Sequence, residues 1–173
     1  MPGRHGDYFS SEYQATDAVG SGPPWEESRG VGGSYGCNRA ENIDDYSTAT
    51  ELVHELIDVV SRGGNLLLNV GPTADGRIPL VMQDRLRDIG TWLEVNGEAI
   101  YGTRSWRSDQ AETGLRYTAK GYDLYALVAE WPRGEIAIEE VGATEGLQVE
   151  MLGLEQAIDR SVTGNRLVIV TTS

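Results

Sequence analysis

The first 46 residues hold the side chains best suited to acid–base chemistry. A glutamate, Glu12, lies in the segment GDYFSSEY, and aromatic residues occur on both sides of it, at Tyr8, Trp25 and Tyr35. Aromatic side chains around a carboxyl group would raise its pKa and suit it to act as a general acid near neutral pH. Most glutamates, however, are solvated surface residues, and that interpretation stays open beside the catalytic one.

A second carboxyl group beside Glu12 would favour glycoside hydrolysis, because glycosidases use two carboxyl groups roughly 5–10 Å apart. Asp7 is excluded as this partner, since in an extended strand it would lie about 16 Å away and point to the opposite face. Asp44 and Asp45 precede a helix, where acidic residues favour the helix dipole. His54 falls inside that helix among apolar residues, so a structural role is the plainer interpretation.

These side chains must be positioned by elements that surround a short apolar run, residues 66–70 (LLLNV). Such a run is typical of a strand buried on both faces of a parallel sheet. One helix precedes it, which Ser47 can cap and Gly63 can end. Pro79 opens a second helix over residues 80–96. Helix, strand, loop and helix together indicate an α/β fold, in which ligands bind at the carboxyl ends of the strands.

Apolar periodicity separates the framework from the loops. Two helix faces are expected, formed by Leu52, Leu56, Val59 and Val60 and by Met82, Leu86, Ile89 and Leu93. Residues 1–46 show neither a helical nor a strand period, so we expect active-site loops there.

Residues 71–76 (GPTADG) lack the Gly-Lys-Ser/Thr ending of a phosphate loop and predict a tight turn. Asn65 and Asn69, at the ends of the strand, are expected to satisfy backbone groups.

From about Trp106 the pattern changes to alternating apolar and polar residues. Five strands are expected, over residues 115–120, 122–131, 135–141, 148–152 and 166–171. Strands that follow one another at this spacing favour an antiparallel sheet or sandwich. We therefore expect two domains, with α/β structure in residues 1–104 and all-β structure in residues 105–173.

The composition argues against several classes of function. The net charge of −13 argues against binding to nucleic acid or to anionic membranes, which both need clustered Lys and Arg. One cysteine and two histidines cannot build a Cys-rich or His-rich metal site, and no cofactor is expected. With no secretory signal or membrane span in the sequence, we expect a soluble chain, cytoplasmic by default, and a longer parent protein could be exported. The sequence is compatible with a monomer and with an oligomer.

Four segments around the apolar run form a specific pattern, namely residues 59–72 (VVSRGGNLLLNVGP), 75–79 (DGRIP), 89–93 (IGTWL) and 96–103 (NGEAIYGT). Upstream, the pattern continues in Trp25-Glu26, in Ser34-Tyr35-Gly36 and in GDYFSSEY. Together these motifs resemble the α-L-fucosidases of glycoside hydrolase family 29. Residues 106–173 fit the C-terminal β-sandwich of that family more loosely.

The resemblance implies a fold, an activity and two site residues. The fold would be the C-terminal part of a (β/α)8-like barrel in residues 1–104, followed by an antiparallel β-sandwich in residues 105–173 that could be incomplete. The activity would be that of a retaining α-L-fucosidase, which releases terminal L-fucose from fucosylated oligosaccharides or glycoconjugates. Glu12 matches the acid/base residue of the family, and Tyr35 matches the aromatic residue that packs against the fucose ring.

One essential group has no match. The nucleophile of the family lies upstream of the acid/base segment, and no stretch of these residues matches it. The fucose-binding histidines and arginine of the family also belong to upstream segments. We therefore expect a fragment that is inactive alone and marginally stable or associated. The competing interpretations are a non-catalytic carbohydrate-binding or structural β-sandwich module built on residues 106–173, and a degraded gene product without activity.

Overall fold

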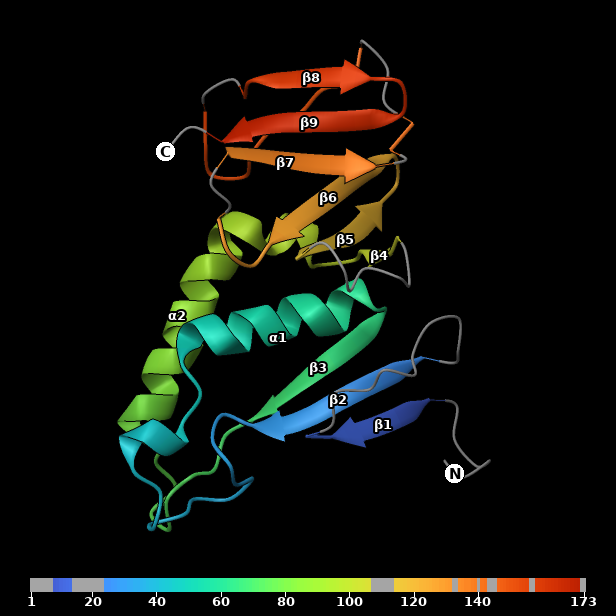
Figure 1. Ribbon diagram of the computed structural model, residues 1–173. Helices are drawn as coiled ribbons and strands as arrows, with labels where there is room; N and C mark the ends of the chain where they lie inside the picture. The colour runs from blue at the N-terminus through green and yellow to red at the C-terminus, as the bar shows by residue number, and fades with distance from the viewer. Residues whose placement is uncertain are drawn as a thin grey trace. The chain divides into compact units, whose positions relative to one another are not determined.

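The computed structural model describes residues 8–13, 24–106, 114–131, 134–139, 141–142, 146–155 and 158–171. The chain divides into two compact units, Met1–Ala129 and Glu130–Ser173. The first unit carries a parallel sheet, two α-helices and an antiparallel sheet, and the second unit carries another antiparallel sheet (Figure 1). Alternating helices and parallel strands, followed by antiparallel strands, confirm the mixed α/β character expected from the sequence.

The parallel sheet consists of β1 (Phe9–Glu12), β2 (Trp25–Gly30) and β3 (Gly64–Asn69), in the order β1-β2-β3. The expectation that residues 1–46 form only loops is therefore wrong for β1 and β2. The sequence of β2, WEESRG, does not alternate between apolar and polar residues, because a glutamate, Glu27, is buried there as well as a tryptophan. Strand β1 has four residues, too few to show a period.

Helix α1 (Ala49–Ser61) lies along the sheet beside β3 (Figure 1). Its N-cap is Thr48, one residue later than the expected Ser47, because Thr48 and Glu51 form a reciprocal capping box. The Glu51 amide donates to Thr48 Oγ1 at 3.2 Å, and the Thr48 amide donates to Glu51 Oε2 at 2.7 Å. Gly63 follows the helix with a φ of 80°, as expected for a left-handed terminating residue.

Strand β3 begins two residues before the expected run and is not buried on both faces. Leu68 packs against the core formed by Val31, Leu52 and Met82. Leu67, whose side chain points the other way, is 49% exposed. Among the described residues α1 covers one face of the sheet, so the other face carries the exposed positions of β3.

Helix α2 (Leu80–Asn96) has the expected bounds and begins directly after Pro79, but its apolar face is narrower than expected. Met82 is fully buried, and Ile89 packs against the same core. Leu86 is 38% exposed, so the buried stripe does not run along the whole helix. A 3-10 turn, η2 (Gly97–Ala99), follows α2 directly.

The remaining strands form two antiparallel sheets. The first contains β4 (Arg104–Ser105), β5 (Leu115–Lys120) and β6 (Asp123–Val128), and the second contains β7 (Gly134–Glu139), β8 (Arg160–Thr163) and β9 (Arg166–Thr171). The expected bounds of β5 and β9 are confirmed. Residues 148–152 are not a strand, because Met151 makes a single bridge to Leu154 there. The short strands β4 and β8 were not anticipated.

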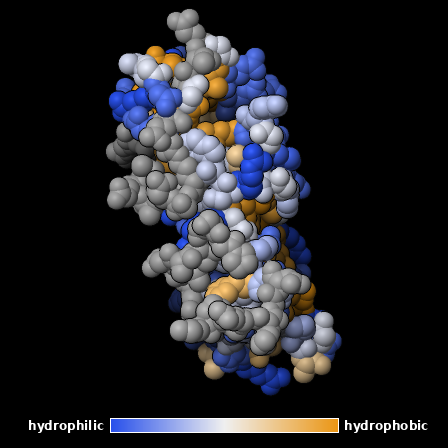
Figure 2. Space-filling view, turned by 90° about the vertical axis from the view of Figure 1, so that its right-hand side faces the viewer, coloured by the Kyte–Doolittle hydropathy of each residue, from blue (hydrophilic) through white to orange (hydrophobic). Residues whose placement is uncertain are grey.

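Both hydrophilic and hydrophobic residues reach the surface. Figure 2 shows hydrophobic residues (orange) at several places between hydrophilic ones (blue) on one face of the molecule. No helix in the described part of the chain is long and apolar enough to span a membrane.

Candidate active site

The carboxyl ends of the three parallel strands meet at one edge of the sheet and bring Glu12 into register with β2. Glu12, the last residue of β1, pairs with Ser28, and Ser28 pairs with Leu67 of β3. Paired residues of a parallel sheet point to the same face. These three side chains therefore form one row across the sheet, with Glu12 exposed to solvent.

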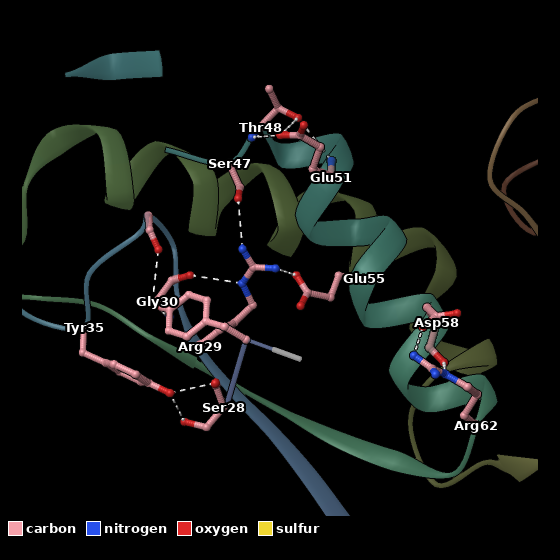
Figure 3. A network of polar contacts seen from close by, with 12 residues as sticks. Ser28, Arg29, Gly30, Tyr35, Ser47, Thr48, Glu51, Glu55, Asp58 and Arg62 are labelled. Atoms are coloured by element: carbon pink, nitrogen blue, oxygen red, sulfur yellow. Dashed lines mark hydrogen bonds and ion pairs between the residues drawn. The ribbon is translucent and has the colours of Figure 1, made fainter. Parts of the chain in front are cut away.

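This row lies on the face that α1 does not cover. The Arg29 guanidinium forms an ion pair with Glu55 of α1, so the residues of β2 in phase with Arg29 point toward the helix (Figure 3). Ser28 alternates with Arg29 and points to the open face. Glu12 shares that face with Ser28, at the edge of the sheet where ligands of α/β folds bind.

Tyr35 is held at the same edge by β2 and β3. Its hydroxyl donates to the Ser28 carbonyl oxygen at 2.7 Å and contacts Ser28 Oγ at 3.1 Å (Figure 3). Its carbonyl oxygen accepts a hydrogen bond of 2.5 Å from Asn69 Nδ2, which confirms that Asn69 satisfies a backbone group. Both ends of the residue are thereby fixed, and Ser28 links Tyr35 to the row that contains Glu12.

The loops that follow β2 and β3 touch at Gly71. A Cβ atom at this position would lie 2.4 Å from the backbone nitrogen of Cys37 and 2.4 Å from the carbonyl carbon of Gly36. Only a residue without a side chain allows this approach. The contact holds the loop that carries Tyr35 against the end of β3.

The loop after β3 is the tight turn that its sequence predicts. The Thr73 amide donates to the Arg77 carbonyl oxygen at 2.8 Å, and the Gly76 amide donates to the Thr73 carbonyl oxygen at 2.8 Å. The hydrogen bond from the Thr73 hydroxyl, and then that from Arg77, hold the pKa of Asp75 below its usual range. The polar groups of this loop are thus largely satisfied by one another.

Several other candidates lie away from Glu12. Trp25 packs on the opposite, α1-facing side of the sheet, and its indole nitrogen donates to the Arg62 carbonyl oxygen at 3.4 Å. It therefore does not supply the aromatic surroundings expected for Glu12. Asp45 accepts a 2.6 Å hydrogen bond from the Asn42 amide in the 3-10 turn η1 (Ile43–Asp45), and His54 is half-buried in α1. Asp7 lies outside the described residues.

Sequence reasoning missed two side chains that contact Tyr35, namely Tyr13 and Ser28, and it did not identify the Tyr35 carbonyl as the backbone group that Asn69 satisfies. The ring of Tyr13 meets the ring of Tyr35 edge-on, with centroids 5.3 Å apart and an interplanar angle of 82°. Ser28 and Asn69 reach Tyr35 only through the register of β2 and β3, for which a single sequence gives no signal. Within the described ranges, no group of three or more His, Cys, Asp or Glu side chains is placed to hold a metal ion.

Comparisons with known proteins identify relatives of this chain. The family model described as Alpha-L-fucosidase matches residues 2–98. An alpha-L-fucosidase of Branchiostoma floridae is 39% identical over 153 residues, covering 86% of this chain and 34% of the relative. The plasma alpha-L-fucosidase of Homo sapiens is 44% identical over 135 residues, covering 73% of this chain and 28% of the relative.

A crystal structure of the Thermotoga maritima alpha-fucosidase superposes with a TM-score of 0.80 and 35% identity, covering 98% of this chain and 39% of that chain. The chain thus spans about a third of the length of the curated relatives that it matches. Because the family model covers more than half of these 173 residues, the chain belongs to the alpha-L-fucosidase family.

Proposed function

We propose that this chain supplies the acid/base residue and one sugar-contacting aromatic residue of a retaining α-L-fucosidase. The observation that carries the proposal is the convergence of Glu12 and Tyr35 on the carboxyl edge of one parallel sheet, linked through Ser28. Membership of the family supports it independently. The substrate class would be glycans that carry terminal L-fucose.

Glu12 would act twice in the reaction. A retaining glycosidase needs one carboxyl group that protonates the leaving oxygen and then deprotonates water, and a second, nucleophilic carboxylate about 5–5.5 Å away. An exposed glutamate at the end of a strand can reach a bound substrate from the open face of the sheet. The nucleophile would come from polypeptide outside these residues, so the chain alone would not turn over substrate.

Tyr35 would form an apolar platform for the sugar. Its hydroxyl is engaged with Ser28, which leaves the ring as the surface that the residue can offer to a ligand. A sugar presents a C–H face to such a ring, and the van der Waals contact excludes water from that face. The hydrogen bonds of the hydroxyl fix the side chain and that of the carbonyl fixes the backbone, which reduces the conformational entropy that binding would otherwise cost.

The finer architecture follows the same proposal. Strands β1–β3 with α1 and α2 would be the last part of a (β/α)8-like barrel, with residues 1–104 as its share of the chain. Residues 105–173 would form the C-terminal β-sandwich domain. In such barrels the catalytic residues lie at the carboxyl ends of the strands, which is where Glu12 stands.

The test joins the 173 residues to the part of the Thermotoga maritima enzyme that precedes the matched region. We expect the joined protein to hydrolyse aryl α-L-fucosides. Glu12→Gln should lower kcat/KM by about 10²–10⁴-fold for a leaving group that needs protonation and much less for α-L-fucosyl fluoride, which does not. Azide should restore turnover of the fluoride by attacking the fucosyl-enzyme intermediate, and the product should be α-L-fucosyl azide with retained configuration.

Glu94→Gln, which changes an exposed glutamate of α2, is the matched control and should leave the rates unchanged. Equal activity of the Glu12→Gln and Glu94→Gln proteins would refute the assignment of the acid/base residue. The purified chain alone should release no aryl leaving group. Release that disappears in Glu12→Ala would overturn the prediction that a separate segment supplies the nucleophile. Saturable sugar binding by residues 106–173 alone would favour the carbohydrate-binding module.

A further inference from the structure

Tyr13, the residue directly after Glu12, has a backbone conformation that side-chain-bearing residues avoid. Its φ is 50°, and among the described residues every other position with positive φ is a glycine. A left-handed conformation costs energy for a residue with a Cβ atom, and it persists only where the surrounding contacts fix it. The contacts of Tyr13 should therefore show why the chain tolerates it.

The Tyr13 hydroxyl bridges the backbone at the end of β2. It accepts a hydrogen bond of 2.8 Å from the Gly30 amide and donates one of 3.3 Å to the Gly32 carbonyl oxygen. A Cβ atom on Gly30 would lie 2.8 Å from this hydroxyl, so position 30 leaves room for it only as glycine. The hydroxyl thus ties the end of β1 to the segment that leads from β2 into the loop of Tyr35.

The Tyr13 ring is fixed from two sides. One contact is the edge-on approach to Tyr35 at 5.3 Å, and the other is the Arg29 guanidinium, whose central carbon lies 5.5 Å from the ring centroid. Arg29 is itself held by its ion pair with Glu55 and by a 3.4 Å contact with Ser47 Oγ. Because α1 anchors the arginine, the ring rests on a rigid element of the fold.

We propose that Tyr13 is a positioning residue, which fixes the carboxyl group of Glu12 relative to the sugar platform of Tyr35. The inference rests on the proposed function of those two residues. A tyrosine that served only the core would be buried, whereas Tyr13 is 41% exposed. Its hydroxyl and its ring both contact the segment that carries Tyr35. The strained backbone at position 13 turns the chain so that the ring can reach this segment directly after Glu12.

The first measurement uses the full 173-residue chain and needs no activity. Tyr13→Phe removes both hydroxyl bonds and keeps the ring, and Tyr122→Phe at the exposed β5–β6 turn is the control. We expect hydrogen exchange at the Gly30 amide to accelerate about 2- to 10-fold in Tyr13→Phe, with lower NMR order parameters at Glu12 and Tyr35. Unchanged exchange and order at these positions would overturn the proposal.

The second measurement uses the joined enzyme and separates positioning from stability. Tyr13→Phe should lower kcat/KM for an aryl fucoside with a poorly acidic leaving group, and spare α-L-fucosyl fluoride, because only the former needs the proton of Glu12. Loss of stability alone would lower kcat/KM for both substrates equally. An equal fall for both substrates, or an unchanged kcat/KM for the aryl fucoside, would contradict the inference. Glu12→Gln is run beside it. If Glu12→Gln lowers kcat/KM equally for the aryl fucoside and the fluoride, the proposed function fails. The exchange data would still decide whether Tyr13 orders the segments that carry Glu12 and Tyr35.

Discussion

Replacing Gly71 by alanine tests the contact between the loops that follow β2 and β3. The new Cβ atom would lie 2.4 Å from backbone atoms of both Gly36 and Cys37. Ordinary van der Waals contact between such atoms needs about 3.5–4 Å. Because the neighbours are backbone atoms, no side chain can rotate to make room, and one loop must move by about 1 Å or more.

The size of the effect follows from this geometry. Overpacking of a well-packed site costs about 1–3 kcal/mol, and a clash with two backbone atoms belongs in the upper part of that range. We therefore expect Gly71→Ala to lower the free energy of unfolding by about 2–3 kcal/mol. For a chain of this length the loss corresponds to a fall in Tm of roughly 4–12 °C.

Urea unfolding followed by circular dichroism measures this loss, with Gly36→Ala as the matched control. A Cβ atom on Gly36 meets no atom within 4 Å, so that substitution should stay within about 0.5 kcal/mol of the unmodified chain. The two glycines belong to the two sides of one contact, which makes the comparison specific. If the Gly71→Ala and Gly36→Ala chains unfold at the same urea concentration, the inferred close approach of the loops is wrong.

Three further predictions concern the framework. Thr48→Ala should cost about 1 kcal/mol of stability, because it removes the side-chain cap of α1. The Thr48 amide, and then the Thr48 hydroxyl, donate to the Glu51 carboxylate and hold its pKa below its usual range in the folded chain. Because the substitution removes only the hydroxyl, the fall in stability on acidification should shrink in part. Gly90→Ala should raise the free energy of unfolding by about 0.5–1 kcal/mol, because the position is an exposed helix interior with open space around it. Burial and then the hydrogen bond to Glu98 raise the pKa of Tyr125 to about 12 from 10.0, so its contribution is complete below pH 10 and is lost between pH 10 and 12. Urea titrations across the pH range check all three, and a Tyr125→Phe chain that loses stability as steeply as the unmodified one over that alkaline range would contradict the third.

Much of the framework could be predicted from apolar periodicity and from residues that begin or end helices. The second helix was bounded correctly over residues 80–96, and its start was marked by Pro79, which directly precedes it. Strand β5 alternates between apolar and polar residues, whereas β9 is a short run of β-branched and other apolar residues, and the bounds of both strands were correct. Strand β2 was not predicted because Glu27 occupies a buried position of the strand where the alternating pattern of a strand would have an apolar residue.

The site was only half accessible to such reasoning. Glu12 and Tyr35 were proposed from a family resemblance, whereas their surroundings depend on strand register. Ser28, Tyr35 and Asn69 are brought together because β2 pairs with β3 in parallel from Trp25 to Gly30. A shift of one residue would turn Ser28 toward α1, and no local feature of the sequence excludes that shift.

The contact at Gly71 also has a practical consequence. Cys37 is the single cysteine of the chain, it is exposed, and its backbone forms one side of that contact. A maleimide fluorophore or a spin label would therefore attach at one place, two residues from Tyr35, without any engineered substitution. Its mobility or emission would report on the local surroundings of Cys37 and would therefore change if the loops that follow β2 and β3 lost their contact.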